Sequence, residues 1–286
     1  MINFMISISQ LKIMQKNVTI LIQRVLFTLI IFNVFIFNSI AETKSKVIKI
    51  AYLVPKKSET SKTELKASLK YLNKNNQFIV EVITFSKISK RPEILNKFDV
   101  LWFYKPDNSD FTVLEQSKEV RAGIYNYLQK GGGLLLSLDA FKYINVLDIE
   151  RKIPEVRQKG TKENEGEQML GFKGFGEHPV FTGLNGGAYI LKPIQDKTVR
   201  LVGYFDDNIP NNGKVVAVDW DNLSVNKKAK IVLEYQIGKG KVIAVGAYML
   251  YSKKNANRNN LEKFTTNCFL YLSGSIKTNA EYWNYR

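Results

Sequence analysis

Acidic side chains follow two apolar runs in the first half of the chain. The run 133–138 stops at Asp139, and the run 98–104 is followed by Asp107 and Asp110 in the segment KPDNSDF. Two carboxylates held at one site can act as general acid and general base on a glycosidic bond or a sugar carbon. Structural roles are open as well, because Asp139 could cap the following helix and the other two acids could form hydrogen bonds in turns.

Nucleophilic chemistry has few candidate residues. His178 is the only histidine and Cys268 the only cysteine, so any Ser–His or Cys–His pair would have to use His178 as its base. Cys268 lies on the apolar face of the expected last helix, which predicts a buried thiol. One histidine and one cysteine cannot build a zinc site of the usual kind. His178 and Asp139 are therefore the candidate catalytic residues, and no metal is expected.

Aromatic residues accompany the acids that follow the run 98–104. Tyr104 ends that run, and Phe111 comes directly after Asp110. Aromatic rings beside acids suit the faces and hydroxyls of sugars, so we predict that Tyr104, Asp107, Asp110 and Phe111 line a ligand site. Trp102 is a candidate for the core instead, because the run is apolar on both of its faces.

Two glycine-rich segments do not fit nucleotide-binding loops. GFKGFG (171–176) lacks the spacing of a dinucleotide-binding loop, and GKGK (238–241) leads into a strand-like run rather than a helix. Neither segment therefore offers a helix N-terminus for a phosphate group, and no nucleotide cofactor is expected.

The order of the apolar and amphipathic segments predicts an α/β fold. Four strand-like apolar runs cover residues 47–54, 78–85, 98–104 and 133–138. Helical patterns at 63–72 and 117–130 and a short helical turn at 92–97 separate these runs. This alternation is typical of a doubly wound, mainly parallel sheet. The carboxyl ends of its strands would then bring the acids described above to one edge.

The second half of the chain predicts additional β-structure. Residues 151–187 show little periodicity and are expected to form an irregular excursion over the sheet edge. Short strand-like runs follow, and the last two flank Gly238-Lys239-Gly240 as a β-hairpin; the runs cover 188–191, 199–205, 214–220, 230–237 and 241–250. A helix over 261–272 closes a domain of residues 42–275, and 276–286 form a short aromatic tail.

The first 41 residues have the pattern of a secretory signal peptide. They contain three basic residues and no acidic one, an apolar stretch at 25–37, and the small residues Ser39 and Ala41. The apolar stretch is shorter than the roughly 20 residues that span a membrane. We therefore predict cleavage after Ala41 and an exported, periplasmic or extracellular chain without a membrane span.

The net charge of the chain is +16, but its pattern does not indicate nucleic-acid binding. The lysines are scattered, and the chain is also rich in asparagine and isoleucine, so a compositional bias accounts for the charge. No basic helix face with interleaved aromatic residues is apparent, and a nucleic-acid partner is not expected. The sequence does not determine the oligomeric state.

Four segments in order resemble the class I glutamine amidotransferase-like superfamily: FDVLWFY (98–104), KGGGLLLSLDAF (130–141), GEHPVFTGL (176–184) and GKGKVIAVGAY (238–248). The likeness is greatest to its trehalose-utilisation (ThuA-like) branch and to the middle domain of some β-galactosidases. The resemblance implies a flavodoxin-like sheet with its site at the carboxyl ends of the strands. Amidotransferases carry a cysteine between glycines at the strand-to-helix turn, where we expect Asp139 here, so glutaminase activity is not expected. By analogy with relatives, Glu177 could complete a site beside His178.

The expected function is that of an exported member of this superfamily without amidotransferase activity. It would bind a carbohydrate or related small ligand at the carboxyl ends of the strands, in a role accessory to polysaccharide utilisation. Two alternatives stay open. One is a carboxylate-dependent hydrolase that acts on a sugar, and the other is a protein-interaction module that docks through the tail 276–286.

Overall fold

The computed structural model describes residue 23 and residues 46–107, 109–159, 170–174, 178–184, 187–191, 199–205, 209–219, 229–247 and 249–276. The chain divides into two compact units, Met1–Ser45 and Lys46–Arg286, and the fold below is that of the second unit. The predicted signal peptide (except residue 23), Glu177, and the predicted tail beyond residue 276 lie outside the described residues.

Five parallel strands form one half of a nine-stranded sheet in the order β2-β1-β3-β4-β11. They are β1 (Ile48–Val54), β2 (Phe78–Thr84), β3 (Val100–Lys105), β4 (Gly133–Leu138) and β11 (Gly240–Val245). This is the flavodoxin-like order, in which the direction of winding reverses between β1 and β3. The predicted α/β fold with a mainly parallel, doubly wound sheet is confirmed.

Four antiparallel strands extend the sheet beyond β11 in the order β10-β9-β6-β7. They are β6 (Leu170–Gly174), β7 (Gly187–Leu191), β9 (Lys214–Asp219) and β10 (Lys230–Ile237). The β10–β11 pair is the predicted hairpin, and Gly238 in its turn has a φ of 57°, a conformation that favours glycine. A separate antiparallel pair consists of β5 (Glu155–Lys159) and β8 (Val199–Tyr204).

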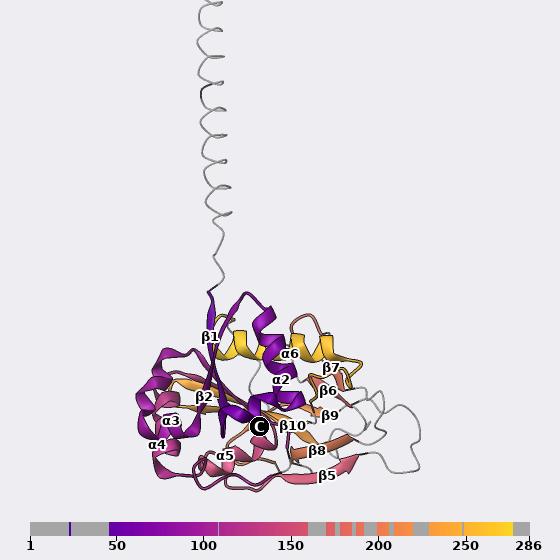
Figure 1. Cartoon of the computed structure of the whole chain (residues 1–286). Coiled ribbons are helices and arrows are strands. Elements are labelled where there is room, and N and C mark those ends of the chain that lie inside the picture. Colours follow the sequence, from indigo (N-terminus) through magenta and orange to yellow (C-terminus); the bar gives the residue numbers. More distant parts are fainter. Residues whose placement is uncertain are drawn as a thin grey trace, which may run out of the picture. The chain divides into compact units, whose positions relative to one another are not determined.

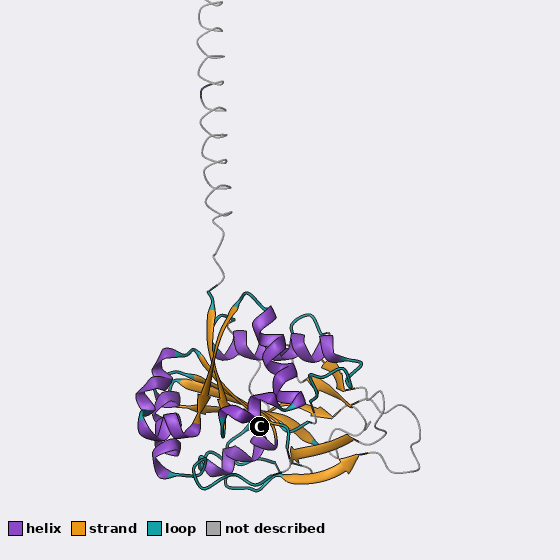
Figure 2. Cartoon of the chain, viewed as in Figure 1, coloured by secondary structure: helices purple, strands orange, loops and turns teal. Residues whose placement is uncertain are grey.

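Helices cover both faces of the sheet (Figures 1 and 2). The core under α2 (Thr63–Lys74) and α6 (Arg258–Leu272) contains Trp102, and the core under α3 (Phe85–Lys90) and α4 (Lys118–Gln129) contains Phe103. Short helices fill the connections: η1 (Lys57–Ser61), η2 (Pro92–Lys97), η3 (Asp139–Lys142), α5 (Tyr143–Val146) and η4 (Pro179–Phe181). Adjacent residues of a strand point to opposite faces, which is why a strand that is apolar throughout serves both cores.

The helix α2 shows how sequence spacing produces this packing. Leu65, Ser68 and Leu72 recur at intervals of three or four residues and are buried against the sheet. The hydroxyl of Tyr71 donates to the backbone oxygen of Glu262 at 2.9 Å, which joins α2 to α6 on the same face. Cys268 of α6 is buried in this core, as predicted, and burial raises the pKa of its thiol well above its usual range.

The segment 151–187 differs from its prediction as an irregular excursion. It contains β5, which pairs with β8, and β6, which pairs with β7 and β9. Phe85, predicted to end a strand, instead begins α3, because the Thr84 hydroxyl accepts a hydrogen bond from the backbone N–H of Lys87 and caps the helix. Among the described residues, no helix has both the length and the apolar character needed to cross a membrane.

Candidate functional site at the carboxyl edge of the parallel strands

The turn that follows β4 has a strained backbone at Leu138 rather than at Asp139. Leu138 has φ 62° and ψ −131°, a conformation that side-chain-bearing residues rarely adopt, and its side chain is fully buried in the core. Sharp strand-to-helix turns of this kind hold the nucleophile in several enzyme classes. Asp139 was expected at this turn and lies one residue beyond the strained position, which is occupied by a leucine without a nucleophilic group.

Asp139 begins η3 and is only 3% exposed. One of its carboxylate oxygens lies 3.7 Å from Nζ of Lys142, one turn further along. The residue before Asp139 is the N-cap of η3, and no side-chain hydrogen bond caps this helix, so the capping alternative for Asp139 does not hold. Ser137 points into the core, where its hydroxyl accepts a hydrogen bond of 3.0 Å from Nε1 of Trp102.

The end of β3 carries a buried lysine paired with an acid. The side chain of Lys105 is 5% exposed, and its Nζ lies 2.6 Å from Oδ1 of Asp107 and 2.5 Å from the hydroxyl of Ser109. The Ser109 hydroxyl donates to the same Asp107 oxygen at 2.6 Å. A buried ammonium group needs such partners, because an unpaired charge at this position would lose its hydration without compensation.

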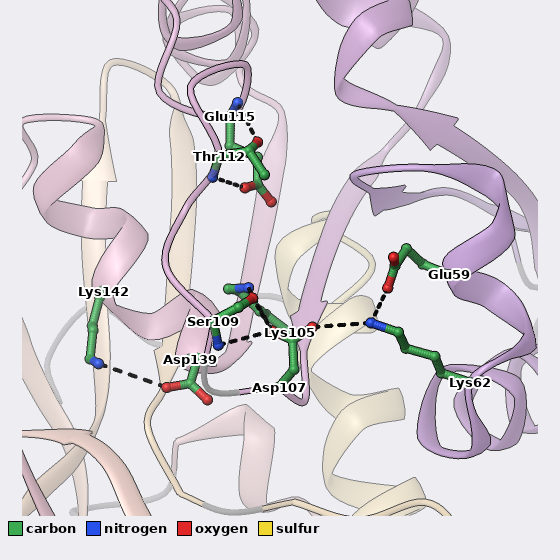
Figure 3. A network of polar contacts seen from close by, with 9 residues as sticks. All are labelled: Glu59, Lys62, Lys105, Asp107, Ser109, Thr112, Glu115, Asp139 and Lys142. Atoms are coloured by element: carbon green, nitrogen blue, oxygen red, sulfur yellow. Dashed lines mark hydrogen bonds and ion pairs between the residues drawn. The ribbon is translucent and has the colours of Figure 1, made fainter.

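A second lysine reaches the same carboxylate from the other side of the strand reversal. Lys62 follows β1 and precedes α2, and its Nζ lies 3.5 Å from Oδ2 of Asp107 and also pairs with Glu59. Figure 3 shows these side chains converging on Asp107, with Asp139 and Lys142 at the neighbouring strand end. We call Glu59, Lys62, Lys105, Asp107 and Ser109 the edge network.

The edge network lies where ligands bind in folds of this type. In open α/β sheets, ligands bind beyond the carboxyl ends of the strands, at the point where the strand order reverses. Here the order reverses between β1 and β3, and the ion pair of Lys62 with Asp107 joins the segments that follow these two strands. The sequence predicted Asp107 at this edge but missed both lysines; a charged residue at the end of an apolar strand was the available signal for Lys105.

Asp107 is held in its ionised form. Partial burial raises the pKa of its carboxyl group, but hydrogen bonds from Lys105 and Ser109 outweigh this effect and lower the pKa to about 2. The carboxylate is nevertheless 39% exposed. Asp107 can therefore accept hydrogen bonds from a ligand over the whole range from mildly acidic to alkaline pH.

The other predicted ligand-binding residues have different environments. Tyr104 is 2% exposed and its hydroxyl donates to the backbone oxygen of Met249 at 2.8 Å, so it belongs to the core rather than to a ligand-facing surface. Phe111 is half-buried and packs edge-on against Tyr143, with its ring centroid 5.9 Å from Nζ of Lys105. Asp110 is exposed to solvent beside it.

His178 lies in a different part of the molecule from Asp139. It is buried beneath α6, where its Nδ1 accepts a hydrogen bond of 3.1 Å from the backbone N–H of Val180 and its Nε2 lies 3.7 Å from a carboxylate oxygen of Glu234. The hydroxyl of Tyr271 donates to Glu234, and Nζ of Lys241 lies 3.9 Å from the Tyr271 ring centroid. Lys241 is at the beginning of β11, whereas Asp139 follows the end of β4, so the structure does not bring the two candidate catalytic residues together.

His178 should make the stability of the protein depend on pH. Burial and the nearby Lys241 lower the pKa of its imidazole against the opposing effect of Glu234. Because the unfolded chain then binds a proton more readily than the folded one, the free energy of unfolding should fall as the pH drops through about 6.5. Urea unfolding between pH 8 and 5.5 measures this slope.

The matched variant for the pH experiment is His178→Asn, which can still accept a hydrogen bond at the start of η4. Since the chain contains no other histidine, this variant should have a flatter stability profile over the same pH range. An unchanged slope in the variant would show that another group takes up the proton.

No group of three or more His, Cys, Asp or Glu side chains within the described part of the chain is arranged to hold a metal ion. The carboxylates of the edge network are instead paired with lysines. The edge network offers hydrogen bonds and paired charges to a polar ligand.

Comparisons with known proteins assign no family to the chain. No protein-family model matches it. No curated protein matches it either. Among solved structures, a β-galactosidase from a Rahnella species aligns with 12% identity and a TM-score of 0.49, over 78% of this chain and 31% of that one.

Two further solved structures give similar values. A β-galactosidase from Bacillus circulans aligns at 11% identity and TM-score 0.47, over 81% of this chain and 32% of that one. A carbohydrate deacetylase aligns at 11% identity and TM-score 0.46, over 79% of this chain and 33% of that one. The chain spans about a third of the length of these three proteins.

Proposed function

We propose that this chain is an exported carbohydrate-binding protein without amidotransferase activity, and that its edge network holds the ligand. Export rests on the leader pattern of residues 1–41. The lack of amidotransferase activity rests on Leu138, because a buried leucine at the strained turn offers no nucleophile. An accessory role in polysaccharide utilisation is the physiological setting that this proposal implies.

The observation that carries the proposal is the exposed, ionised carboxylate of Asp107 between two lysines. A sugar presents neighbouring hydroxyl groups that each donate and accept hydrogen bonds, so a carboxylate flanked by ammonium groups can satisfy both functions. Lys105 and Ser109 fix the carboxylate from the buried side at 2.6 Å each, which leaves Oδ2 facing the more exposed Lys62. Such preorganisation reduces the entropy that a ligand must lose on binding.

Replacing Asp107 with asparagine should weaken sugar binding by at least about tenfold, because a charge-assisted hydrogen bond is lost and Lys105 loses its anionic partner. A screen of neutral and acidic sugars by thermal shift, followed by titration calorimetry on the hits, measures the effect. Binding by the unmodified chain should vary little with pH above about 4, since the pKa of Asp107 is about 2.

The matched control is Asp110→Asn, which removes the same charge from an exposed position three residues away. It should leave both binding and stability close to those of the unmodified chain. If no sugar in the screen binds, or if both variants weaken binding equally, the edge network is not a carbohydrate site.

A second function, hydrolysis of a sugar derivative, is favoured by the placement of Asp139. The register of β3 with β4 pairs Lys105 with Leu138, so Asp107 and Asp139 follow the ends of neighbouring parallel strands. Two carboxylates at one edge could divide the roles of general acid and general base. Chromatography of the binding mixtures for released sugars distinguishes turnover from binding alone.

A further inference from the structure

The outer face of α2 carries lysines at intervals of four residues. Lys66, Lys70 and Lys74 are all exposed, and Lys62 occupies the N-cap position of the same helix. Residues four apart stack along one side of a helix with a rise of about 6 Å. The row therefore points away from the buried side formed by Leu65, Ser68 and Leu72.

This arrangement does not help the chain to fold. Like charges four residues apart on a helix destabilise it by a few tenths of a kcal/mol per pair. Among the described residues, Lys66, Lys70 and Lys74 form no ion pair, and only Lys62 has acidic partners, Glu59 and Asp107.

Neighbouring acids are engaged elsewhere rather than with the lysine row. Glu64, on the opposite side of α2, accepts hydrogen bonds from the backbone N–H groups of Tyr251 and Ser252. Glu262 of α6, which lies next to Tyr71, pairs with Arg258. The positive potential of the row is therefore not cancelled from within the fold by these two acids.

We propose that the lysine row of α2 binds a linear acidic polysaccharide and guides it to the edge network. The row ends at Lys62, whose Nζ contacts Asp107, so a chain lying along α2 leads directly to that carboxylate. A polymer with one carboxylate on each sugar unit presents a regular line of charges that matches a single row of ammonium groups. The assignment to a polysaccharide rests on the proposed function of the edge network.

The composition of the helix surface favours a polysaccharide over other polyanions. The exposed positions of α2 other than the lysines are Thr63 and Asn73, whose polar side chains suit sugar hydroxyls. Single-stranded nucleic acids are bound largely by stacking of bases on aromatic rings, and the aromatic residue of α2, Tyr71, is buried. Amphipathic helices that lie in anionic membranes add exposed apolar side chains to their lysines, and α2 exposes none.

The test compares binding of a defined-length oligogalacturonate to the unmodified chain and to three variants at low and high salt. In the first variant, Lys66, Lys70 and Lys74 are replaced by glutamine. In the second, the exposed residues Lys97, Lys130 and Lys239 are replaced by glutamine, which removes the same charge from other surfaces. The third variant, Asp107→Asn, disables the edge network and leaves the row intact.

The α2 variant should bind the oligogalacturonate about tenfold more weakly and with less salt dependence, since three exposed charge contacts are lost. The second variant should bind like the unmodified chain. Asp107→Asn should keep the salt-dependent part of the binding, so failure of the edge network is distinguishable from failure of the row. Neutral sugars should bind equally to the α2 variant and the unmodified chain.

Three results would overturn the inference. One is the absence of salt-dependent binding to the unmodified chain, and another is an equal loss in the α2 variant and its charge-matched control. The third is tighter binding of single-stranded DNA or of phosphatidylserine vesicles than of oligogalacturonate through the same three lysines.

Discussion

Replacing Trp102 with alanine should lower the free energy of unfolding by about 3–5 kcal/mol. The side chain is fully buried on β3, the middle strand of the parallel half of the sheet. Its ring packs against the rings of Tyr52, Tyr251 and Phe269 at centroid distances of 5.2, 5.5 and 5.3 Å. These partners come from β1, the segment after β11, and α6. The cavity would therefore separate the sheet from the helix layer that covers it.

Urea unfolding followed by circular dichroism measures this loss, and two variants separate its causes. Ser137→Ala removes only the acceptor of the Trp102 N–H and should cost about 1–3 kcal/mol, because a buried donor is left unpaired. Trp102→Phe keeps most of the ring packing, so its loss of unfolding free energy should lie between those of Trp102→Ala and Ser137→Ala. If the alanine variant were no less stable than Ser137→Ala, Trp102 would not organise this core.

Replacing Gly246 with alanine should prevent the native packing or lower stability by at least about 3 kcal/mol. A Cβ atom at this position would lie 1.7 Å from the backbone oxygen of Gly203, which cannot move as a side chain does. Gly203 belongs to β8 and itself leaves no room for a side chain, since its Cβ would lie 2.4 Å from the ring of Phe141. The small sheet β5–β8 therefore rests on the ends of β4 and β11 through glycine contacts.

The control for this substitution is Gly274→Ala, where a Cβ meets no atom within 4 Å but the φ of 72° disfavours alanine. Backbone strain alone should cost only about 1 kcal/mol there. Thermal unfolding and the yield of soluble protein compare the two variants. Equal stability of both would mean that β8 is displaced easily from the end of β11.

The regular elements that the sequence predicted correctly are those with local signals. Residues 133–138 are apolar and begin after a glycine cluster, and β4 has these bounds. Pro92 opens the predicted helical turn 92–97, and η2 covers the same residues. In both cases, the residues that end the element and those that pack within it are neighbours in the chain. The apolar pattern and the flanking glycine or proline are therefore enough to predict the element.

The strands that the sequence missed are stabilised by distant partners. β5 pairs with β8, and β6 pairs with β7 and β9; β5 is a polar segment without a period-two pattern, and two of the five residues of β6 are glycines. Hydrogen bonding to a neighbouring strand holds such a segment in an extended conformation even where its own side chains do not favour a strand.

Within the candidate site, the sequence identified the edge but not its organisation. Asp107 follows a strand end as predicted. Its partner Lys62 could not be inferred, because Lys62 reaches Asp107 only through the strand order β2-β1-β3-β4. At the turn after β4, where Asp139 was expected, the residue with the strained backbone is Leu138. Strand alternation predicts which face a side chain occupies, but the geometry of a turn depends on how the next helix packs.

By itself, the sequence determined the α/β class, the parallel half of the sheet, the buried thiol of Cys268 and the presence of acids at the carboxyl edge. These features follow from the spacing of apolar residues along the chain, because that spacing reflects which side chains are buried. Only the tertiary structure decided that His178 and Asp139 lie apart, that Tyr104 is in the core, and that Asp107 is held between Lys62 and Lys105. Contacts between side chains far apart in sequence depend on the order and register of strands, and no local pattern encodes that order.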